Sequence, residues 1–154
     1  MSEGRDGPPE AGPPAISGRV LALDYGSARC GCALSDPTGT LATPIDPVLR
    51  PATRRGIGRL AELVRERAVE RVVVGLPLGM SGADTAQTEE ARAFAARLAE
   101  RLGPGVPVEL YDERLTTVQA LRDPQGGGAS LDSRAAAHLL EAWLAARSSQ
   151  RELS

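Results

Sequence analysis

The chain has 154 residues, of which 42% are apolar and 25% charged, as expected for one globular domain with a buried core. The formal net charge of −2 excludes an overall positive field that would attract nucleic acid. All the basic residues are Arg, which suits phosphate contact, although biased codon usage explains this more simply. No run reaches the roughly 18 apolar residues of a membrane span, and no signal pattern begins the chain, so we expect a cytoplasmic protein without membrane contact.

The first ordered segments are predicted to be strands. Arg19–Asp24 is an apolar run, and Arg29–Ser35 follows it after a short turn, which predicts an antiparallel hairpin. A third, short strand is expected over Thr40–Ile45, because Pro44 and Pro47 lack the N–H groups that a sheet needs.

Helices and strands alternate in the rest of the chain. Helical spacing of Leu and Val predicts a helix over Thr53–Ala68, and an all-apolar run predicts a buried strand over Arg71–Gly75. The later elements are expected to be a helix over Asp84–Leu102, a strand over Val106–Tyr111, a short helix over Thr116–Arg122, a Gly-rich loop over Gln125–Ser130 and a final helix over Leu131–Arg147.

This order predicts an α/β fold with a mixed five-stranded sheet, in which an antiparallel meander precedes parallel β-α-β units and helices cover both faces. The domain is expected to span residues 18–147. Residues 1–17, rich in Gly and Pro, are expected to be a disordered tail, and residues 148–154 a frayed end.

Three acidic residues stand far apart in sequence but at places that converge in such a fold. Asp24 ends the first strand, Glu113 follows the last strand, and Asp132 begins the last helix. Converging carboxylates repel one another unless a cation lies between them, so the pattern favours a Mg²⁺ or Mn²⁺ site. The sequence leaves open whether Asp112 or Glu113 is the ligand.

Four motifs, in order, resemble the YqgF/RuvX family of the ribonuclease H-like superfamily. They are Asp24–Gly31, Gly75–Gly82, Tyr111–Thr117 and Asp132–Leu140, and the similarity covers roughly residues 19–146. The family includes pre-16S rRNA nucleases and Holliday junction resolvase-like proteins. The resemblance therefore implies a ribonuclease H-like fold and a divalent-metal-dependent endonuclease, with either 5′-end maturation of precursor 16S rRNA or junction resolution as its role.

The resemblance also implies roles for individual residues. Asp24, Glu113 and Asp132 would be the catalytic metal ligands of a two-metal phosphodiester hydrolysis, with ions about 4 Å apart. The expected supporting residues are Asp112, Arg114, Gly26, Thr116 and Thr117, and the expected nucleic-acid contacts are Arg29, Arg54, Arg55, Gly75 and Gly82.

Several positions depart from the family pattern. Ala28 replaces a common Lys, Gly79 replaces a common Asn, and the loop Gln125–Ser130 carries no positive charge. Resolvases of the superfamily usually carry their second acid on the fourth strand, where this chain has Gly75, so the fifth strand would supply that acid. These changes affect the expected nucleic-acid contacts and leave the carboxylates in place.

The oligomeric state stays open between monomer and homodimer. Cys30 and Cys32 are expected to point the same way from one strand, so they cannot easily bridge each other. They are interpreted as small core residues, with an intermolecular contact across a dimer as the alternative. On the last helix, Leu139, Leu140 and Trp143 define the buried stripe that Asp132 shares, while Ser133, Arg134 and the surface residue His138 are expected to lie outside it.

Two other classes of function fit parts of the sequence. A non-catalytic RNA- or ribosome-binding module would account for the missing Lys and the neutral loop, but would not need all the acids. A sugar-kinase or actin type of phosphotransferase also begins its phosphate loop with Asp-x-Gly, but it needs two such domains to enclose ATP, and this chain has one. The sequence does not decide between RNA and DNA as substrate.

Overall fold

The computed structural model describes residues 18–78, 81–113 and 131–153. Its five-stranded sheet has the order β3-β2-β1-β4-β5, with antiparallel pairing of β1 with β2 and of β2 with β3. The pairs β1–β4 and β4–β5 are parallel. The strands are β1 (Arg19–Asp24), β2 (Arg29–Ser35), β3 (Ala42–Leu49), β4 (Val69–Leu76) and β5 (Val108–Asp112). The predicted α/β architecture with a mixed five-stranded sheet is confirmed.

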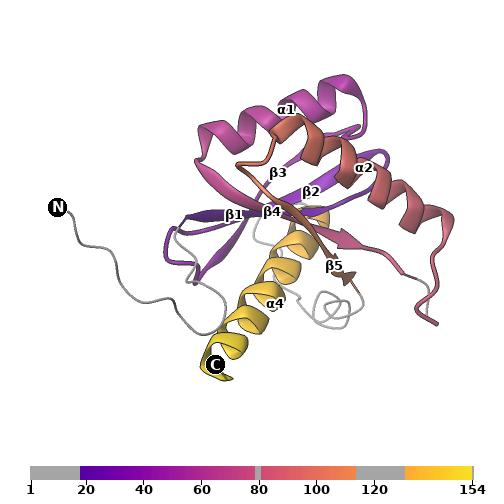
Figure 1. Ribbon diagram of the computed structural model, residues 1–154. Coiled ribbons are helices and arrows are strands. Elements are labelled where there is room, and N and C mark those ends of the chain that lie inside the picture. The colour runs from indigo at the N-terminus through magenta and orange to yellow at the C-terminus, as the bar shows by residue number, and fades with distance from the viewer. Residues whose placement is uncertain (1–17, 79–80, 114–130, 154) are drawn as a thin grey trace.

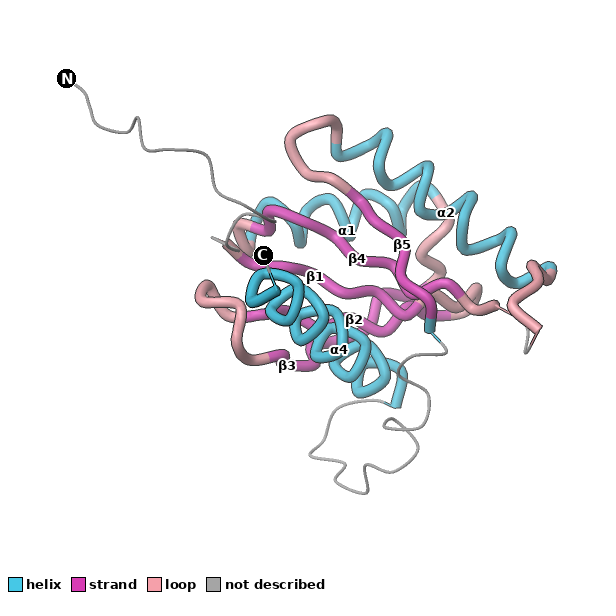
Figure 2. Tube along the Cα trace, turned by 60° about the horizontal axis from the view of Figure 1, so that its bottom comes forward, coloured by secondary structure: helices cyan, strands magenta, loops and turns pink. Residues whose placement is uncertain are grey.

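Helices cover both faces of this sheet. Helices α1 (Arg54–Glu66) and α2 (Ala86–Leu102) lie on one face, and α4 (Leu131–Leu153) crosses the other (Figures 1 and 2). Alternate residues of β1 therefore enter two separate cores. Leu21 and Leu23 pack with α1 and α2, whereas Val20 and Ala22 pack with α4. No helix in the described part of the chain is long and apolar enough to cross a membrane.

The predicted hairpin is confirmed residue for residue, but the third strand is longer than expected. It runs over Ala42–Leu49 and so continues through both Pro44 and Pro47. The reason is its position, because β3 is an edge strand. An edge strand tolerates proline wherever the missing N–H would have faced solvent rather than a neighbouring strand.

The helix ends differ from prediction because side chains cap them. Thr53 and Thr85 precede α1 and α2 and accept hydrogen bonds from backbone N–H groups of the first turn, so α1 begins one residue and α2 two residues later than predicted. At the other end of the chain, α4 continues to Leu153 where a frayed tail was expected. The tail 1–17, the short helix 116–122 and the loop 125–130 lie outside the described residues.

The remaining strands move by one or two residues. The fourth strand runs over Val69–Leu76, longer than predicted at both ends, and the fifth runs over Val108–Asp112, so it both starts and ends later than predicted. Both cysteines are buried with 0% exposure and free. The idea of an intermolecular contact through them is therefore wrong, because a fully buried thiol cannot reach a second chain.

The buried stripe of α4 is wider than predicted. Ser133 has 0% exposure and lies with Ala136, Ala137 and Leu140 against the sheet, so its assignment outside the stripe is wrong. The prediction of a surface His138 is also wrong. Its side chain is only 16% exposed and its Nδ1 lies 3.4 Å from Oε1 of Glu141, because it sits on the flank of the stripe rather than opposite it.

Candidate active site

Asp24 is the last residue of the central strand β1, and it points towards α4. Residues 20 and 22 face α4 in the core, and the two-residue repeat of a strand places Asp24 on the same side. It pairs in register with Gly31 of β2. A carboxylate at this point lies at the sheet edge where the parallel strands end, beneath the first turn of α4.

Glu113 joins Asp24 from two strands away. It directly follows β5, and its side chain is hydrogen-bonded to that of Asp24. Gly75 of β4 makes this approach possible, since a Cβ atom there would lie 2.9 Å from both Cγ and Oε2 of Glu113. The pleat of β5 turns Glu109, Tyr111 and Glu113 to the α4 side. Of the two neighbouring acids, Glu113 is thus the one beside Asp24.

Asp132 enters the site because α4 begins very close to β2. A Cβ atom on Gly31 would lie 2.0 Å from the carbonyl oxygen of Asp132, so only glycine allows this contact. Ser133 fixes the position, because its Oγ accepts a hydrogen bond from the N–H of Cys32 at 3.2 Å and donates one to the carbonyl of Ile45 at 2.6 Å. The first turn of α4 is therefore attached to both β2 and β3.

Burial and the nearby acids raise the pKa of Asp24. Burial raises the pKa of Asp24 from 3.8 to about 8, with further increases from the hydrogen bond to Glu113 and from the charges of Glu113 and Asp132. In the absence of a cation, Asp24 holds a proton near neutral pH. Both of the other predicted acids thus lie close enough to Asp24 to act on it.

The acids do not already form a closed cage. Among the residues that the structure describes, no set of three or more His, Cys, Asp or Glu side chains is arranged to hold a metal ion. Asp24 and Glu113 form a hydrogen-bonded pair, while Oδ2 of Asp132 lies 3.7 Å from Nε of Arg29. Arg29 was predicted to contact nucleic acid. In the structure its exposed side chain lies beside one of the carboxylates, and its contact with nucleic acid stays a prediction.

The other predicted residues fall into three groups. Gly26 forms the turn beside Asp24, where a Cβ atom would lie 2.7 Å from the carbonyl oxygen of Arg29. Arg54 and Arg55 are exposed in α1, across the sheet from α4, so neither joins the carboxylates, and Gly82 adopts φ 87° in the exposed loop before α2. The predicted contributors Arg114, Thr116 and Thr117 lie outside the described residues.

Two positioning residues were missed by sequence reasoning, Gly31 and Ser133. Gly31 carried a usable signal, since a glycine between two buried cysteines of a strand indicates a close approach by another backbone. Ser133 carried none, because a serine in the first turn of a helix is common whether or not it is buried.

Comparison with known proteins bears on what these carboxylates do. The family model described as "RuvX: Holliday junction resolvase" matches residues 18–146. The chain belongs to the RuvX family. Two relatives named "Putative pre-16S rRNA nuclease" are close to this RuvX protein in sequence. The one from Koribacter versatilis is 40% identical over 91% of this chain and 95% of its own length. The one from Mycobacterium leprae (strain Br4923) is 45% identical over 82% of this chain and 72% of its own length.

Solved structures support the fold of this RuvX protein. The structure "Thermus thermophilus RuvC structure" aligns with a TM-score of 0.54 at 19% identity, covering 86% of this chain and 97% of that one. The structure "T. thermophilus RuvC in complex with Holliday junction substrate" aligns with a TM-score of 0.53 at 18% identity, over 86% and 96% of the two chains. At this identity the likeness establishes the shared ribonuclease H-like fold, as the motifs predicted.

Proposed function

We propose that this protein is a divalent-metal-dependent endonuclease that matures the 5′ end of precursor 16S rRNA in the cytoplasm. The observation that carries the proposal is the convergence of Asp24, Glu113 and Asp132 at one edge of the sheet. The names of the RuvX relatives, pre-16S rRNA nucleases, supply the substrate.

The three acids suit Mg²⁺ or Mn²⁺ because they offer only oxygen ligands and because their mutual repulsion calls for positive charge. Asp24 would lie between the other two acids, with Glu113 and Asp132 as the outer ligands. Two such ions, when bound, would supply an activated water and stabilise the leaving oxygen of a phosphodiester.

The protein's own residues prepare this site. Asp24 must release its proton before both of its oxygens can serve as ligands. The hydrogen bond between Asp24 and Glu113 must break at the same time. Asp132 must give up its contact with Arg29 in order to bind a metal ion. The guanidinium of Arg29 is then free to bind the phosphate that is cut. Ser133 and Gly31 keep the start of α4 in place throughout.

The proposal is tested by cleavage of a labelled precursor 16S rRNA fragment with Mn²⁺ or Mg²⁺, comparing the wild type with Asp24→Asn. We expect metal-dependent cutting at a defined position, and loss of that cutting in the variant although its fold is intact. RNA binding without any cutting in either metal would contradict the proposal and favour a non-catalytic RNA-binding module.

Junction resolution is the second candidate, because the matching family model is described as a Holliday junction resolvase. A resolvase cuts two strands symmetrically and therefore needs two sites related by a dimer axis. A four-way DNA junction should be included beside the RNA, with light scattering to measure mass with and without the junction. A monomer on the junction, or a preference for the RNA, would rule against resolution.

A further inference from the structure

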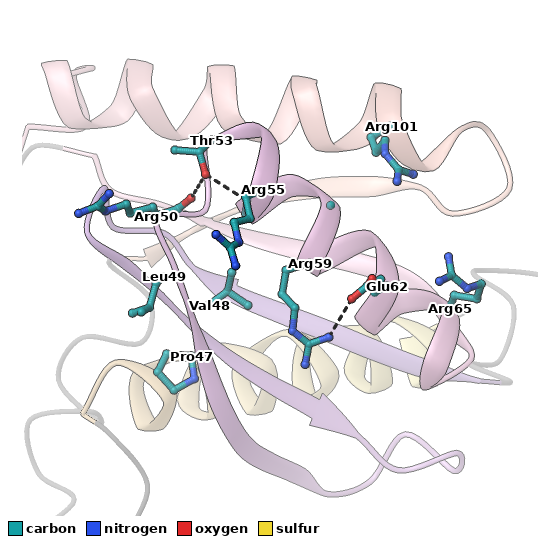
Figure 3. Close-up of a pocket in the computed structure, with 12 residues that line it drawn as sticks. Pro47, Val48, Leu49, Arg50, Thr53, Arg55, Arg59, Glu62, Arg65 and Arg101 are labelled. Atoms are coloured by element: carbon teal, nitrogen blue, oxygen red, sulfur yellow. Dashed lines mark hydrogen bonds and ion pairs between the residues drawn. The ribbon is translucent and has the colours of Figure 1, made fainter.

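We propose that a groove on the α1 side of the molecule, lined by arginines, binds the phosphate backbone of the RNA strand that leads to the cleavage site. The proposal deepens the proposed function and rests on it. The groove lies between the edge strand β3 and α1 and has a volume of about 1100 Å³ (Figure 3). We call it the Arg groove, after Arg50, Arg55, Arg59, Arg65 and Arg101, which line it.

Positive charge in the Arg groove is largely unbalanced. Arg59 contacts Oε1 of Glu62 at 3.4 Å and Oε1 of Glu66 at 3.8 Å. The other four arginines have no carboxylate partner among the described residues. In a chain of net charge −2, such a local surplus of guanidinium groups is a site for an anion.

The arginines come from three separate segments, which distinguishes the groove from an ordinary solvated helix face. Arg50 lies between β3 and α1, Arg55 and Arg65 lie on α1, and Arg101 lies in the last turn of α2. Figure 3 shows Arg50 at one end of the groove, with Arg65 and Arg101 at the other. A hollow walled by charges from several elements fits an extended anion better than a single ion.

The length of the groove matches a short stretch of a nucleic-acid strand. Ten residues of helix separate Arg55 from Arg65, a rise of about 15 Å. A groove of this length spans a few consecutive phosphates of one nucleic-acid strand. The exposed apolar side chain of Leu49 at the mouth of the groove offers a surface on which a base can rest.

The Leu49 end of the Arg groove lies next to Arg29, the arginine that contacts Asp132. Leu49 pairs in register with Arg29 of β2, and the N–H of Arg50 donates to the carbonyl of Ala28 at 2.9 Å. Arg29 in turn lies 3.7 Å from Asp132. An RNA strand that leaves the groove at Leu49 would therefore pass Arg29 before it reaches the acids.

Gly58 allows a sharp test, because it lines the groove and a Cβ atom there would meet nothing within 4 Å. Gly58→Glu and Gly58→Gln have the same size and both favour the helix, and only the first adds negative charge. In the Asp24→Asn background and without metal, we expect Gly58→Glu to bind a labelled precursor 16S rRNA fragment 5- to 20-fold more weakly than Gly58→Gln.

Arginine variants give an independent measurement. Arg55→Gln and Arg65→Gln should each weaken binding of the same RNA about 3- to 10-fold and lower the slope of log affinity against log salt by about 0.7–0.9. Arg67→Gln is the matched control, because it removes the same charge from the end of the same helix but does not line the groove. It should change affinity less than 2-fold.

Equal effects of the three arginine variants, or equal binding by Gly58→Glu and Gly58→Gln, would overturn the Arg groove as the binding site. Cleavage measured with Asp24 restored separates this result from failure of the nuclease proposal. If RNA is cut but binding ignores the groove, only the groove is wrong. If the groove variants weaken binding but no RNA is cut, the groove stands and the nuclease activity does not.

Discussion

The two faces of the sheet are built from different side chains and serve different ends. The face under α1 and α2 is packed with large residues, including Leu21, Leu60, Phe94 and Leu98. The core under α4 has a larger share of small residues, among them Ala22, Ala33, Ala136 and Ala137. Large side chains bury more apolar area and therefore give more of the stability, while small ones let a helix come close to the strands.

The difference shows how a carboxylate from a helix reaches the end of a central strand. At Gly31 the backbone of α4 lies directly on β2, and Ser133 binds it there by hydrogen bonds. The core under α4 buries less apolar area, but the close approach of the helix brings Asp132 to the site. Changes on one face should thus alter chemistry, and changes on the other should alter stability.

The largest effect is expected within the site, where neighbouring acids can be compared. Glu113→Gln should lower the rate of RNA cleavage at least 10²- to 10³-fold, because it removes a proposed ligand whose side chain contacts Asp24. Asp112→Asn, one residue earlier on the opposite side of the strand, should change that rate less than 3-fold. Rates at saturating metal and RNA measure both. Equal losses of rate in the two variants would mean that the side of β5 on which an acid lies does not determine whether it binds the metal.

A large effect on stability alone is expected from the other face. Leu98 has 0% exposure in the core under α2. Leu98→Ala should lower the free energy of unfolding by about 2–5 kcal/mol, the usual cost of such a cavity. Cleavage by the folded protein, measured well below the melting temperature, should change less than 2-fold. A loss of activity as large as that of Glu113→Gln would show that the faces are not independent.

Two buried serines offer a smaller and closely matched comparison. Ser133 bonds the backbone of β2 and β3 beside the carboxylates, and Ser35 accepts a hydrogen bond from the N–H of Val20 at 2.8 Å at the far end of β2. Either serine to alanine should cost about 1–3 kcal/mol of stability in urea unfolding. Only Ser133→Ala should also slow cleavage, by about 10-fold, because a displaced catalytic group costs rate.

The last comparison is a pH dependence in the stability of the metal-free protein. The folded-state pKa of Asp24 is about 8, against an ordinary value of 3.8, so between these values the folded protein holds a proton that the unfolded chain has lost. Asp24 therefore makes the free energy of unfolding decrease as pH rises from 4 to 8, by at most about 1.4 kcal/mol per pH unit. Melting curves across this range should show the slope in the wild type and its reduction in Asp24→Asn. Saturating Mn²⁺ should also reduce it.

Much of this arrangement could be predicted from sequence. The bounds of β1 and β2 were correct, since apolar runs ended by glycine or turn residues are strong local signals. The three acids were correctly expected to converge, because strand ends and the start of the last helix meet at one edge of such a sheet.

What failed depended on contacts between distant segments. The choice between Asp112 and Glu113 rests on which face of β5 meets α4, and a strand of five residues carries too little pattern to fix that. The burial of Ser133 follows from the missing side chain of Gly31, a residue 102 positions earlier in the chain. The length of β3 depends on its place at the sheet edge, which no local pattern records.

That edge has a further consequence for how the protein behaves at high concentration. An open strand can recruit a strand from another molecule and start aggregation. In β3, Pro44 and Pro47 remove two hydrogen-bond donors, and an irregular register opposite Cys30–Cys32 disturbs the regular spacing of the rest. The two prolines that seemed to end the strand thus leave it in place while making it a poor template for uncontrolled self-association.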